Sequence, residues 1–390
     1  MEEWKEYKLG EVVNILDYKR VPLSSKERST RKGIYPYYGA QGIIDYIDDF
    51  IFNGTYLLIA EDGENLKSQK QNIAQLATGK YWVNNHAHIV ESNGLCDIRY
   101  LCYLLNTMDI SGYITGSAQP KLNQANLSLI SVNLPPVNIQ KRIAEFLSRF
   151  DDKIEVNRRI NDNLEQQAQA LFKSWFVDFE PFKDHPLVES ELGMIPQGWK
   201  VVSLGDLMTY NGGSQPPASE FIDHYEEGYI RFIQIRDYAS DGHLTYIPIS
   251  KRNKLCDVRD IMIARYGASL GRICYGLKGA YNVALAKVTP VNKYYMEYLR
   301  CFLNTRDFYE GINNKGNRAV QAGFNQSDIQ SFRVAFPENE NVLREFEEIC
   351  SSFFDQRLTI ELESRRLAEL RDTLLPRLMS GELKVDEVNV

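Results

Sequence analysis

The chain has 390 residues, of which 44% are hydrophobic and 25% are charged, and this balance is typical of a folded protein with two or three domains. No stretch approaches the roughly 18 apolar residues of a membrane span, and the six cysteines form no Cys-x-x-Cys pair, which argues against a disulfide framework and a zinc knuckle. We therefore expect a cytoplasmic protein without membrane contact. The net charge of −7 argues against a nucleic-acid partner unless positive charge is local, and residues 199–337 hold 17 Lys and Arg against 13 Asp and Glu.

The first 138 residues are predicted to form a domain with strands at 43–47 and 55–60 and a short helix at 98–105. Basic residues gather in a loop ahead of the glycine-containing segment 36–42. Arg and Lys bind phosphates and guanine, while Asn and Gln bind adenine, so this loop and the polar turn near residue 84 are interpreted as DNA contacts. The candidate residues are Lys19, Arg20, Arg28, Arg31, Lys32, Tyr37, Tyr38, Gln41, Lys80, Asn84 and His86.

A second interpretation concerns His86 and His88, which alternate along the chain. Alternate residues of a strand face the same side, so the two imidazoles could share a metal ion. No acid or cysteine stands at ligand spacing beside them, and we therefore predict no metal site. A polar strand edge or turn that contacts substrate and a structural hydrogen-bonding cluster both stay open.

A long helix is predicted at 139–178, because neither Gly nor Pro occurs from Ile139 to Phe176. Apolar and small residues recur there in steps of four and three, which is the 3.5-residue period of a coiled-coil seam. Asn157 and Asn161 stand in the middle of the seam, where buried Asn fixes register and partner number; a solvent-facing mid-helix is the alternative. The predicted interface residues of this helix are Leu147, Phe150, Ile154, Asn157, Asn161, Leu164, Leu171 and Trp175.

A proline-containing linker at 179–198 leads into the second domain, predicted at 199–338 with strands at 229–235 and 260–264 and a helix at 295–303. Arg231, Gln234 and Arg236 follow one another along the first of these strands, so they are expected to lie on related faces. The candidate DNA-binding residues of this domain are Gln215, Arg231, Gln234, Arg236, Arg265, Tyr266, Ser269, Arg272, Lys315 and Arg318.

A second long helix is predicted at 339–380, followed by a tail at 381–390. Its seam is less regular, because Arg357, Ser364 and Arg371 interrupt it. Two helices of roughly 55 Å with apolar faces are unstable alone, so we expect them to pack antiparallel with a globular body at each end. The interface residues of this helix are Phe353, Ile360, Leu367, Leu374 and Leu378, and with those of the first helix they form the predicted subunit interface.

The two halves of the chain share a frame. Trp4–Glu11 returns as Trp199–Asp206, and Gln119–Gln124 returns as Gln321–Gln326, while the segments between them differ. A period of half the chain predicts two domains and not a solenoid. The predicted fold class is α+β, with two mixed α/β domains, each followed by a long helix, and the helices paired as an antiparallel coiled coil in a pseudo-twofold arrangement.

Motifs for catalysis are absent from the sequence. The Pro-Pro sites at 135–136 and 216–217 lack the tetrapeptide of an amino-methyltransferase, and no glycine-rich dinucleotide loop or triphosphate-binding loop occurs. We predict no catalytic residue and no bound cofactor.

The frame resembles the specificity (S) subunit of Type I restriction-modification systems. The resemblance covers nearly the whole chain and is carried by Ile195–Lys200, Leu204–Asp206, Leu171–Phe176, Asp178–Phe179, Leu374–Leu383, Pro36–Ala40, Pro120–Asn123, Ile233–Asp237 and Arg265–Gly267. It implies two target-recognition domains that each read half of a bipartite site on double-stranded DNA, held apart by the paired helices. It also implies that two methyltransferase (modification) subunits carry S-adenosylmethionine and that restriction subunits use ATP and magnesium.

We therefore expect a non-catalytic subunit that reads an asymmetric DNA site and scaffolds the enzyme subunits. A coiled-coil scaffold that binds only protein and a stand-alone DNA-modifying enzyme are the alternatives.

Overall fold

The computed structural model describes residues 4–68, 71–116, 119–239, 242–316 and 323–388, without the side chains of 315 and 316. The chain divides into two compact units. Unit 1 consists of Met1–Val156 and Glu363–Val390, and unit 2 consists of Asn157–Leu362. Each unit therefore contains one globular body together with part of each of two long helices, α6 (Val137–Phe176) and α11 (Glu340–Met379).

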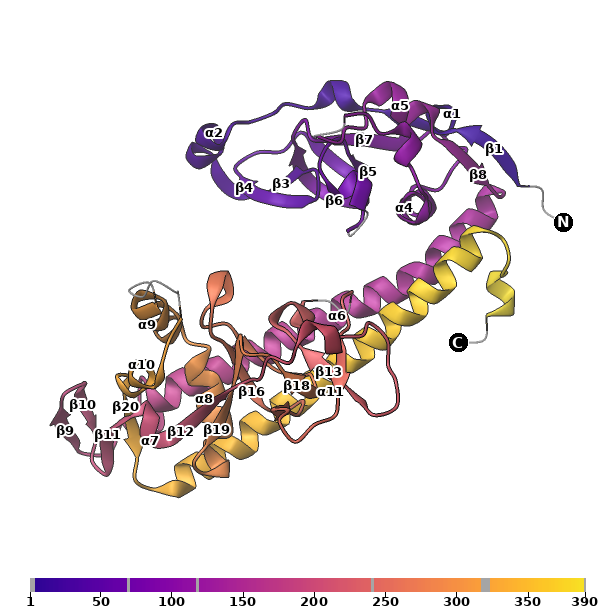
Figure 1. Ribbon diagram of the computed structural model, residues 1–390. Coiled ribbons are helices and arrows are strands. Elements are labelled where there is room, and N and C mark those ends of the chain that lie inside the picture. The colour runs from indigo at the N-terminus through magenta and orange to yellow at the C-terminus, as the bar shows by residue number, and fades with distance from the viewer. Residues whose placement is uncertain (1–3, 69–70, 117–118, 240–241, 317–322, 389–390) are drawn as a thin grey trace. The chain divides into compact units, whose positions relative to one another are not determined.

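Body 1, the globular part of unit 1, is built on one six-stranded sheet (Figure 1). Its strands are β1 (Lys5–Lys8), β2 (Val13–Ile15), β3 (Lys32–Gly39), β4 (Gly42–Ile47), β5 (Phe52–Ala60), β6 (Ala74–Val83), β7 (Ala87–Ser92) and β8 (Ser131–Leu134). Its helices are α1 (Leu9–Val12), η1 (Asp17–Lys19), α2 (Ser25–Thr30), α3 (Asn65–Ser68), α4 (Ile98–Thr107), η2 (Ser111–Tyr113) and α5 (Gln124–Leu129). The sheet order is β2-β7-β5-β6-β3-β4, and only the β3–β6 pair is parallel. Apolar residues on β5 and β7 and the apolar face of α4 form its core, with Leu57, Val90 and Leu101 fully buried.

Body 2, the globular part of unit 2, contains two four-stranded sheets in place of one larger sheet. Their orders are β12-β19-β16-β17 and β14-β13-β18-β15. The strands of unit 2 are β9 (Leu187–Ser190), β10 (Gly193–Pro196), β11 (Trp199–Ser203), β12 (Met208–Gly212), β13 (Tyr229–Ile233), β14 (Tyr246–Pro248), β15 (Leu255–Cys256), β16 (Ile261–Ala264), β17 (Ile273–Cys274), β18 (Gly279–Tyr281), β19 (Leu285–Pro290) and β20 (Arg333–Pro337). Its helices are η3 (Glu180–Phe182), α7 (Leu204–Leu207), η4 (Ala218–Glu220), η5 (Ile235–Tyr238), η6 (Gly267–Ser269), η7 (Lys293–Tyr295), α8 (Met296–Leu303), α9 (Arg306–Gly316) and α10 (Gln326–Gln330).

Both bodies begin and end on the same motif, which is the structural form of the sequence repeat. The entry strand pairs antiparallel with the exit strand, β1 with β8 and β11 with β20, and we call each such pair a neck. A short helix follows each entry strand and another precedes each exit strand. The Leu9 amide donates to Ile130 O at 2.8 Å in body 1, and the Leu204 amide donates to Phe332 O at 2.9 Å in body 2. Each body is therefore a closed module on a two-stranded neck.

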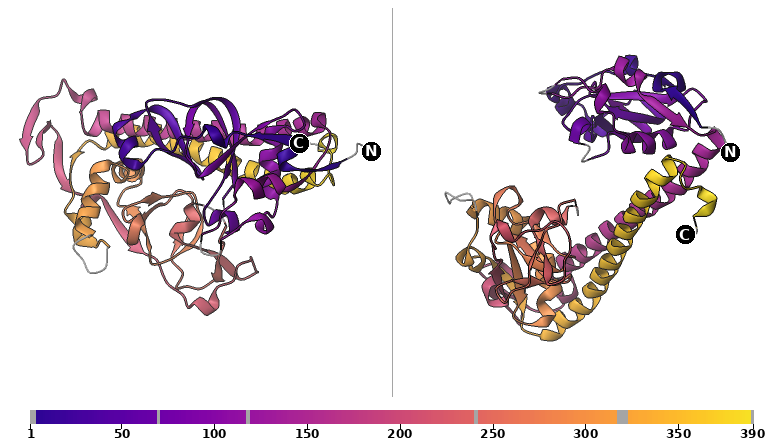
Figure 2. Two further views of the ribbon diagram at one scale, coloured as in Figure 1. Left: turned by 90° about the horizontal axis from the view of Figure 1, so that it is seen from above. Right: turned by 45° about the vertical axis from the view of Figure 1, so that its right-hand side comes forward.

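The helices α6 and α11 pack side by side and antiparallel in each unit (Figures 1 and 2). In unit 1, Leu147 and Phe150 of α6 share a buried cluster with Leu374 and Leu378 of α11. Further along α6, Lys153 Nζ lies 3.4 Å from Oε2 of Glu363, the first residue of α11 that belongs to unit 1. Rising residue numbers on α6 thus meet falling numbers on α11, as expected for an antiparallel pair.

The α+β class, the two long helices and their antiparallel packing are confirmed. The short segments predicted at 43–47, 55–60, 98–105, 260–264 and 295–303 match β4, β5, α4, β16 and α8 within a few residues. The predicted limits of the six domain segments stay predictions, because the two compact units divide each long helix between them. After the C-terminal end of α11, η8 (Val385–Glu387) closes the described chain.

Candidate nucleic-acid interface

The predicted basic loop of body 1 is paired with carboxylates of the same body. Arg28 Nε lies 3.2 Å from one oxygen of Asp45, and Lys32 Nζ lies 2.7 Å from the other. Arg31 Nε lies 2.9 Å from Asp48 Oδ1. These pairs tie α2 and the start of β3 to β4 and its following turn, and they neutralise most of the positive charge that the sequence places there.

Two predicted DNA contacts in body 1 are corrected by their burial. Tyr37 is 0% exposed, and its hydroxyl accepts a hydrogen bond from the Leu23 amide at 2.9 Å. Asn84 is 6% exposed, and its Oδ1 accepts a hydrogen bond from the His86 amide at 2.8 Å. Both side chains hold turns of the fold and lie beneath the surface that a duplex reaches.

The other candidates of body 1 lie nearer to solvent. Tyr38 is half-buried against the ring of Tyr81. The side chains that stay exposed are Lys19, Gln41, Lys80 and His86.

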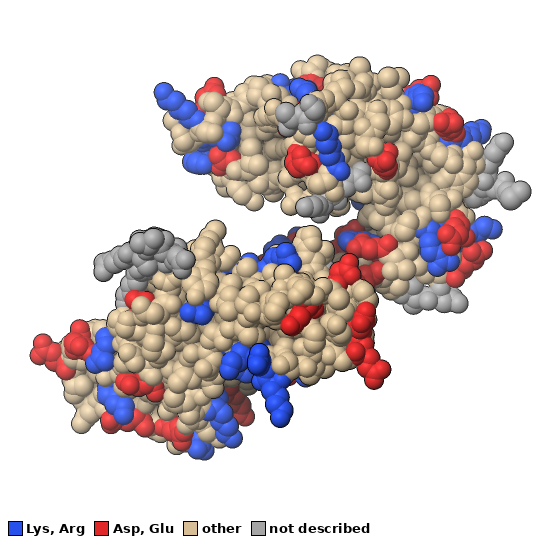
Figure 3. All heavy atoms as spheres, in the orientation of Figure 1, with Lys and Arg blue, Asp and Glu red and all other residues tan. Residues whose placement is uncertain are grey.

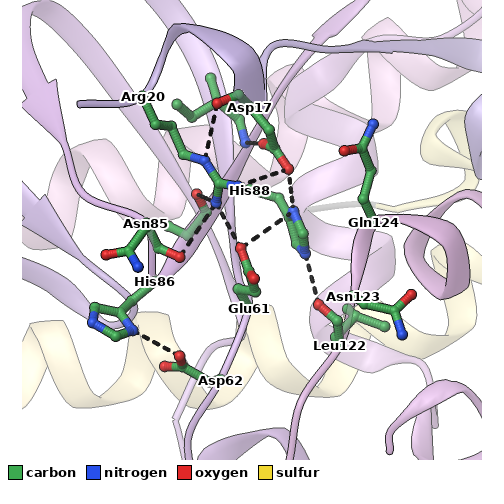
Figure 4. A network of polar contacts seen from close by, with 12 residues as sticks. Asp17, Arg20, Glu61, Asp62, Asn85, His86, His88, Leu122, Asn123 and Gln124 are labelled. Carbon is green, nitrogen blue, oxygen red and sulfur yellow. Dashed lines mark hydrogen bonds and ion pairs between the residues drawn. The ribbon is translucent and has the colours of Figure 1, made fainter. Parts of the chain in front are cut away.

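Arg20, also predicted to contact DNA, is instead the centre of a network of polar contacts (Figure 4). Its Nη1 lies 2.6 Å from Glu61 Oε2 and donates to Ala87 O at 2.9 Å, and its Nη2 lies 3.3 Å from Asp17 Oδ2. The side chain is only 15% exposed. This prediction is corrected, because the guanidinium already has two carboxylate partners and faces inward.

His88 extends the network to the segment that repeats in both halves of the chain. Its Nδ1 lies 2.5 Å from Asp17 Oδ2 and its Nε2 lies 2.7 Å from Leu122 O, so both ring nitrogens face acceptors. Burial raises the pKa of the Asp17 carboxyl, but the hydrogen bond and charge of His88 outweigh it, and the pKa lies below the ordinary value. The pKa of Glu61 is lowered in the same way, since Arg20, His88 and Lys121 outweigh its burial.

These carboxylates do not fit a divalent cation. Ligand atoms of Asp17, Glu61 and His88 lie within 4.8 Å of one another. Arg20 and Lys121, whose Nζ is 3.2 Å from Glu61 Oε1, already supply positive charge at the same oxygens.

His86 does not join His88 in the network. Its Nδ1 lies 2.6 Å from Asp62 Oδ2, so the two imidazoles contact different carboxylates (Figure 4). The interpretation that both share a metal fails because β6 ends at Val83 and β7 begins at Ala87, which leaves His86 in the turn.

The strand predicted at 229–235 ends at Ile233, which separates three candidates of body 2. Asp237 is buried, and its Oδ2 accepts a hydrogen bond from the Gln234 amide at 2.8 Å. This bond starts η5, so Arg236 lies in a helical turn and not on the strand with Arg231. The prediction that the three side chains share related faces of one strand is therefore wrong.

Four of the remaining candidates of body 2 lie in or next to η6, namely Arg265, Tyr266, Ser269 and Arg272. The Arg265 guanidinium lies 5.0 Å from the centre of the Tyr266 ring, and Tyr266 is 42% exposed. Ser269 and Arg272 line a cavity of about 680 Å³. Gln215 is exposed elsewhere in body 2, and Arg318 and the side chain of Lys315 lie outside the described residues.

Sequence reasoning missed the other wall of this cavity. Asn304, Arg306 and Tyr309 line it from the end of α8 and the start of α9, and all three residue types bind phosphates or bases. The sequence did contain a signal, because the polar and basic residues Asn304, Thr305 and Arg306 directly follow the predicted helix at 295–303. That this segment lies across the cavity from Arg272 depends on the tertiary fold, so it could not be predicted from the sequence.

All thirteen predicted interface residues are buried or half-buried within the chain. Leu147, Phe150, Asn157, Leu164, Leu374 and Leu378 are buried, and the other seven are half-buried. They serve the intramolecular packing of α6, α11 and the bodies. For the six buried residues the prediction of a contact between subunits is corrected, because the chain itself covers their side chains.

Charge on the surface is mixed. On the face seen in Figure 3, Lys and Arg side chains lie among Asp and Glu side chains. In the part of the chain that is described, no helix is long and apolar enough to cross a lipid bilayer.

Two bodies with different sheets, each entered and left through the same kind of neck and followed by a long helix, define a two-domain protein built on an internal repeat. The family model of the Type I restriction modification DNA specificity domain matches residues 1–166 and 196–372. The chain belongs to this family.

Named relatives are similar over most of the chain. It is 29% identical over 326 residues to the Type I restriction enzyme MjaIX specificity subunit of Methanocaldococcus jannaschii, covering 77% of this chain and 72% of that subunit. It is 23% identical to the HindI specificity subunit of Haemophilus influenzae, covering 85% and 84%. The fold resembles the crystal structure of the Type I restriction-modification S subunit from M. genitalium, with a TM-score of 0.60, 16% identity and 96% of each chain covered.

Proposed function

We propose that this chain is the non-catalytic DNA-recognition subunit of a Type I restriction-modification complex and reads an asymmetric bipartite site. The observation that carries the proposal is the combination of one neck motif with two different bodies. Body 1 has one sheet of six strands, and body 2 has two sheets of four. Two such different surfaces favour two different half-sites.

The proposal assigns the chemistry to partners. Two modification subunits would bring S-adenosylmethionine, and restriction subunits would bring ATP and magnesium, while this chain binds no cofactor. Membership of the DNA specificity family supports an assembly with DNA and other subunits. We propose that this assembly works in the cytoplasm.

We propose a smaller set of side chains for DNA contact, chosen for their exposure or for their place beside η6. In body 1 we retain the exposed Lys19, Gln41, Lys80 and His86. In body 2 the proposed contacts are Arg265, Tyr266, Ser269, Arg272 and Arg306, which gather at η6 and the cavity beside it. Lys and Arg neutralise phosphates, while Gln and Arg hydrogen-bond to base edges.

Methylome sequencing tests the proposal. Cells without other modification systems would express this chain together with its modification partner, and the expected result is methylation at one split, non-palindromic motif. Cells that express the partner alone provide the control. Active methylation without a split motif would contradict the proposal, and a palindromic split motif would contradict the assignment of different half-sites.

A further inference from the structure

Two half-buried arginines interrupt the apolar seam of α11, and each meets a half-buried acid of α6. Arg371 pairs with Asp151 in unit 1, and Arg357 pairs with Glu165 in unit 2. The Arg357 side chain is 13% exposed and that of Arg371 is 26% exposed. A charge placed in an apolar seam costs desolvation energy, so these positions call for an explanation beyond stability.

Each ion pair is also bonded to a tyrosine of the body in its own unit. The Tyr103 hydroxyl, from α4, donates to Asp151. The Tyr275 hydroxyl, which follows β17, accepts a hydrogen bond from Arg357. A tyrosine hydroxyl both donates and accepts, so it serves the acid in one unit and the arginine in the other. In each unit the same three-part contact therefore joins the body, α6 and α11.

The spacing of the two pairs selects a single register. Glu165 follows Asp151 by 14 residues, and Arg357 precedes Arg371 by 14 residues, so one antiparallel register forms both pairs. Fourteen residues are two heptads, so the two arginines take equivalent positions on the seam of α11 and the two acids take equivalent positions beside the seam of α6. A slip by one heptad breaks both pairs, and a slip by two heptads restores only one. An apolar seam alone discriminates weakly between such registers.

We propose that the Asp151–Arg371 and Glu165–Arg357 pairs, each fastened to its body by a tyrosine, set the register of α6 against α11 and thereby the gap between the two half-sites. The inference rests on the proposed function. A slip of seven residues moves one helix by about 10 Å along the other. One DNA turn of about 34–36 Å holds about 10 base pairs, so the gap would change by about 3 base pairs.

The first test replaces all four charges by leucine, with Asp151→Leu, Glu165→Leu, Arg357→Leu and Arg371→Leu in the full chain. Even fully buried ion pairs can often be replaced by apolar residues without loss of stability, and these pairs are half-buried, so this variant is expected to fold and assemble. With the modification partner present, we expect methylated motifs with at least one second gap length, about 3 base pairs from the native one. Methylation at the native gap alone would overturn the proposal.

Two further variants make the test specific. The first variant exchanges the charges within each pair, with Asp151→Arg, Arg371→Asp, Glu165→Arg and Arg357→Glu. Both pairs can form again, so the native gap should be the only gap length. A second gap length in this variant counts against the proposal. Lys153 and Glu363 form a matched control, since this ion pair joins the same helices but its side chains are 48% and 45% exposed. Lys153→Ala with Glu363→Ala should keep the native gap, and a changed gap in this control would count against the Asp151–Arg371 and Glu165–Arg357 pairs as the feature that sets the register.

Cross-linking reads the register without DNA. Lys153→Cys and Glu363→Cys, introduced together, should join through a short bismaleimide in the otherwise native chain. In the four-leucine variant the cross-linked fraction is expected to fall at least twofold, and an unchanged fraction would overturn the proposal whether or not the variant methylates DNA. A native complex that methylates no split motif would remove the proposed function, while the cross-linking result would still stand for the register.

Discussion

At the scale of single residues, His86 and His88 show how two identical side chains, two positions apart, take different roles. His88 is 1% exposed and bonds Asp17 and Leu122, whereas the His86 side chain is 49% exposed and bonds Asp62. The difference comes from the end of β6, which places one imidazole in the turn and the other on β7. The buried one is part of the fold of body 1, and the exposed one is available to a ligand.

We expect His88→Ala to destabilise unit 1 by about 1–3 kcal/mol, because the substitution removes a buried hydrogen-bond partner of both Asp17 and Leu122 O. His86→Ala is the matched control and should cost at most about 1 kcal/mol, as for other exposed pairs. Urea unfolding of the full chain, followed by hydrogen exchange of β5 and β7, measures both. Equal costs for the two substitutions would contradict the structural role of the network.

A half-buried carboxyl of α11 predicts a pH dependence in unit 2. Burial raises the pKa of Glu347 to about 7, although its bond from the Glu297 amide and the charges of Arg300 and Arg259 act in the opposite direction. The folded state therefore binds more protons than the unfolded state between the ordinary value of 4.5 and about 7. The stability that this group contributes is fully present below 4.5 and is lost as pH rises through 7.

The melting temperature of unit 2 should accordingly fall as pH rises from 5 to 8, and Glu347→Gln should flatten that slope. Glu345→Gln, at an exposed position of the same helix, is the control and should keep the slope. Differential scanning calorimetry at several pH values measures it. A wild-type slope in the Glu347→Gln variant would show that another group titrates.

For DNA contact, Arg272 is the most informative single residue, since it is exposed and lines the cavity beside η6. If it binds a phosphate, Arg272→Ala should weaken binding by the assembled complex about tenfold and lower the slope of log affinity against log salt by about 1. Lys278→Ala provides the control, because Lys278 is exposed but pairs with Asp257 at 3.1 Å. Titration at three salt concentrations measures both slopes, and identical slopes for the two variants would remove Arg272 from the contact set.

At the scale of elements, the helices were predictable because their signals are local. A Gly- and Pro-free stretch with a 3.5-residue period predicts α6, and a less regular repeat predicts α11, which contains Pro376; both helices end within two residues of their predicted limits. Strand ends were less predictable, as at Gln234, where a buried Asp237 starts a turn in the middle of a β-branched run. The partners of Arg357 and Arg371 could not be predicted, since an ion pair between residues about 200 positions apart depends on the register of two helices.

The buried amide in the middle of α6 provides a prediction about this element. Asn157 is 1% exposed, so Asn157→Leu should raise the free energy of unfolding by about 1 kcal/mol and weaken the selection of one register or oligomeric state. Asn163→Leu is the control, because Asn163 is exposed on the same helix. Chemical denaturation and light scattering of the full chain measure the two effects. A loss of stability in Asn157→Leu together with a single assembly size would contradict the specificity role. The same test applies to Asn161, whose native side-chain amide donates to Arg357 O at 3.4 Å, with Asn161→Leu as the variant.

At the scale of the whole molecule, the two necks make the bodies exchangeable parts. Because β1 pairs with β8 and β11 pairs with β20, the chain enters and leaves each body at one place. Replacing residues 5–134 by the matching segment of a relative should therefore change one half-site and leave the other half-site and the gap as they were. Replacing residues 199–337 should change only the opposite half, so each exchange controls the other. Methylome sequencing of cells that express each chimera with the modification partner measures the outcome. A chimera in which both half-sites change, or in which the gap changes, would show that a body reads DNA together with its helices. A chimera in which neither half-site changes would indicate a scaffold that binds only protein.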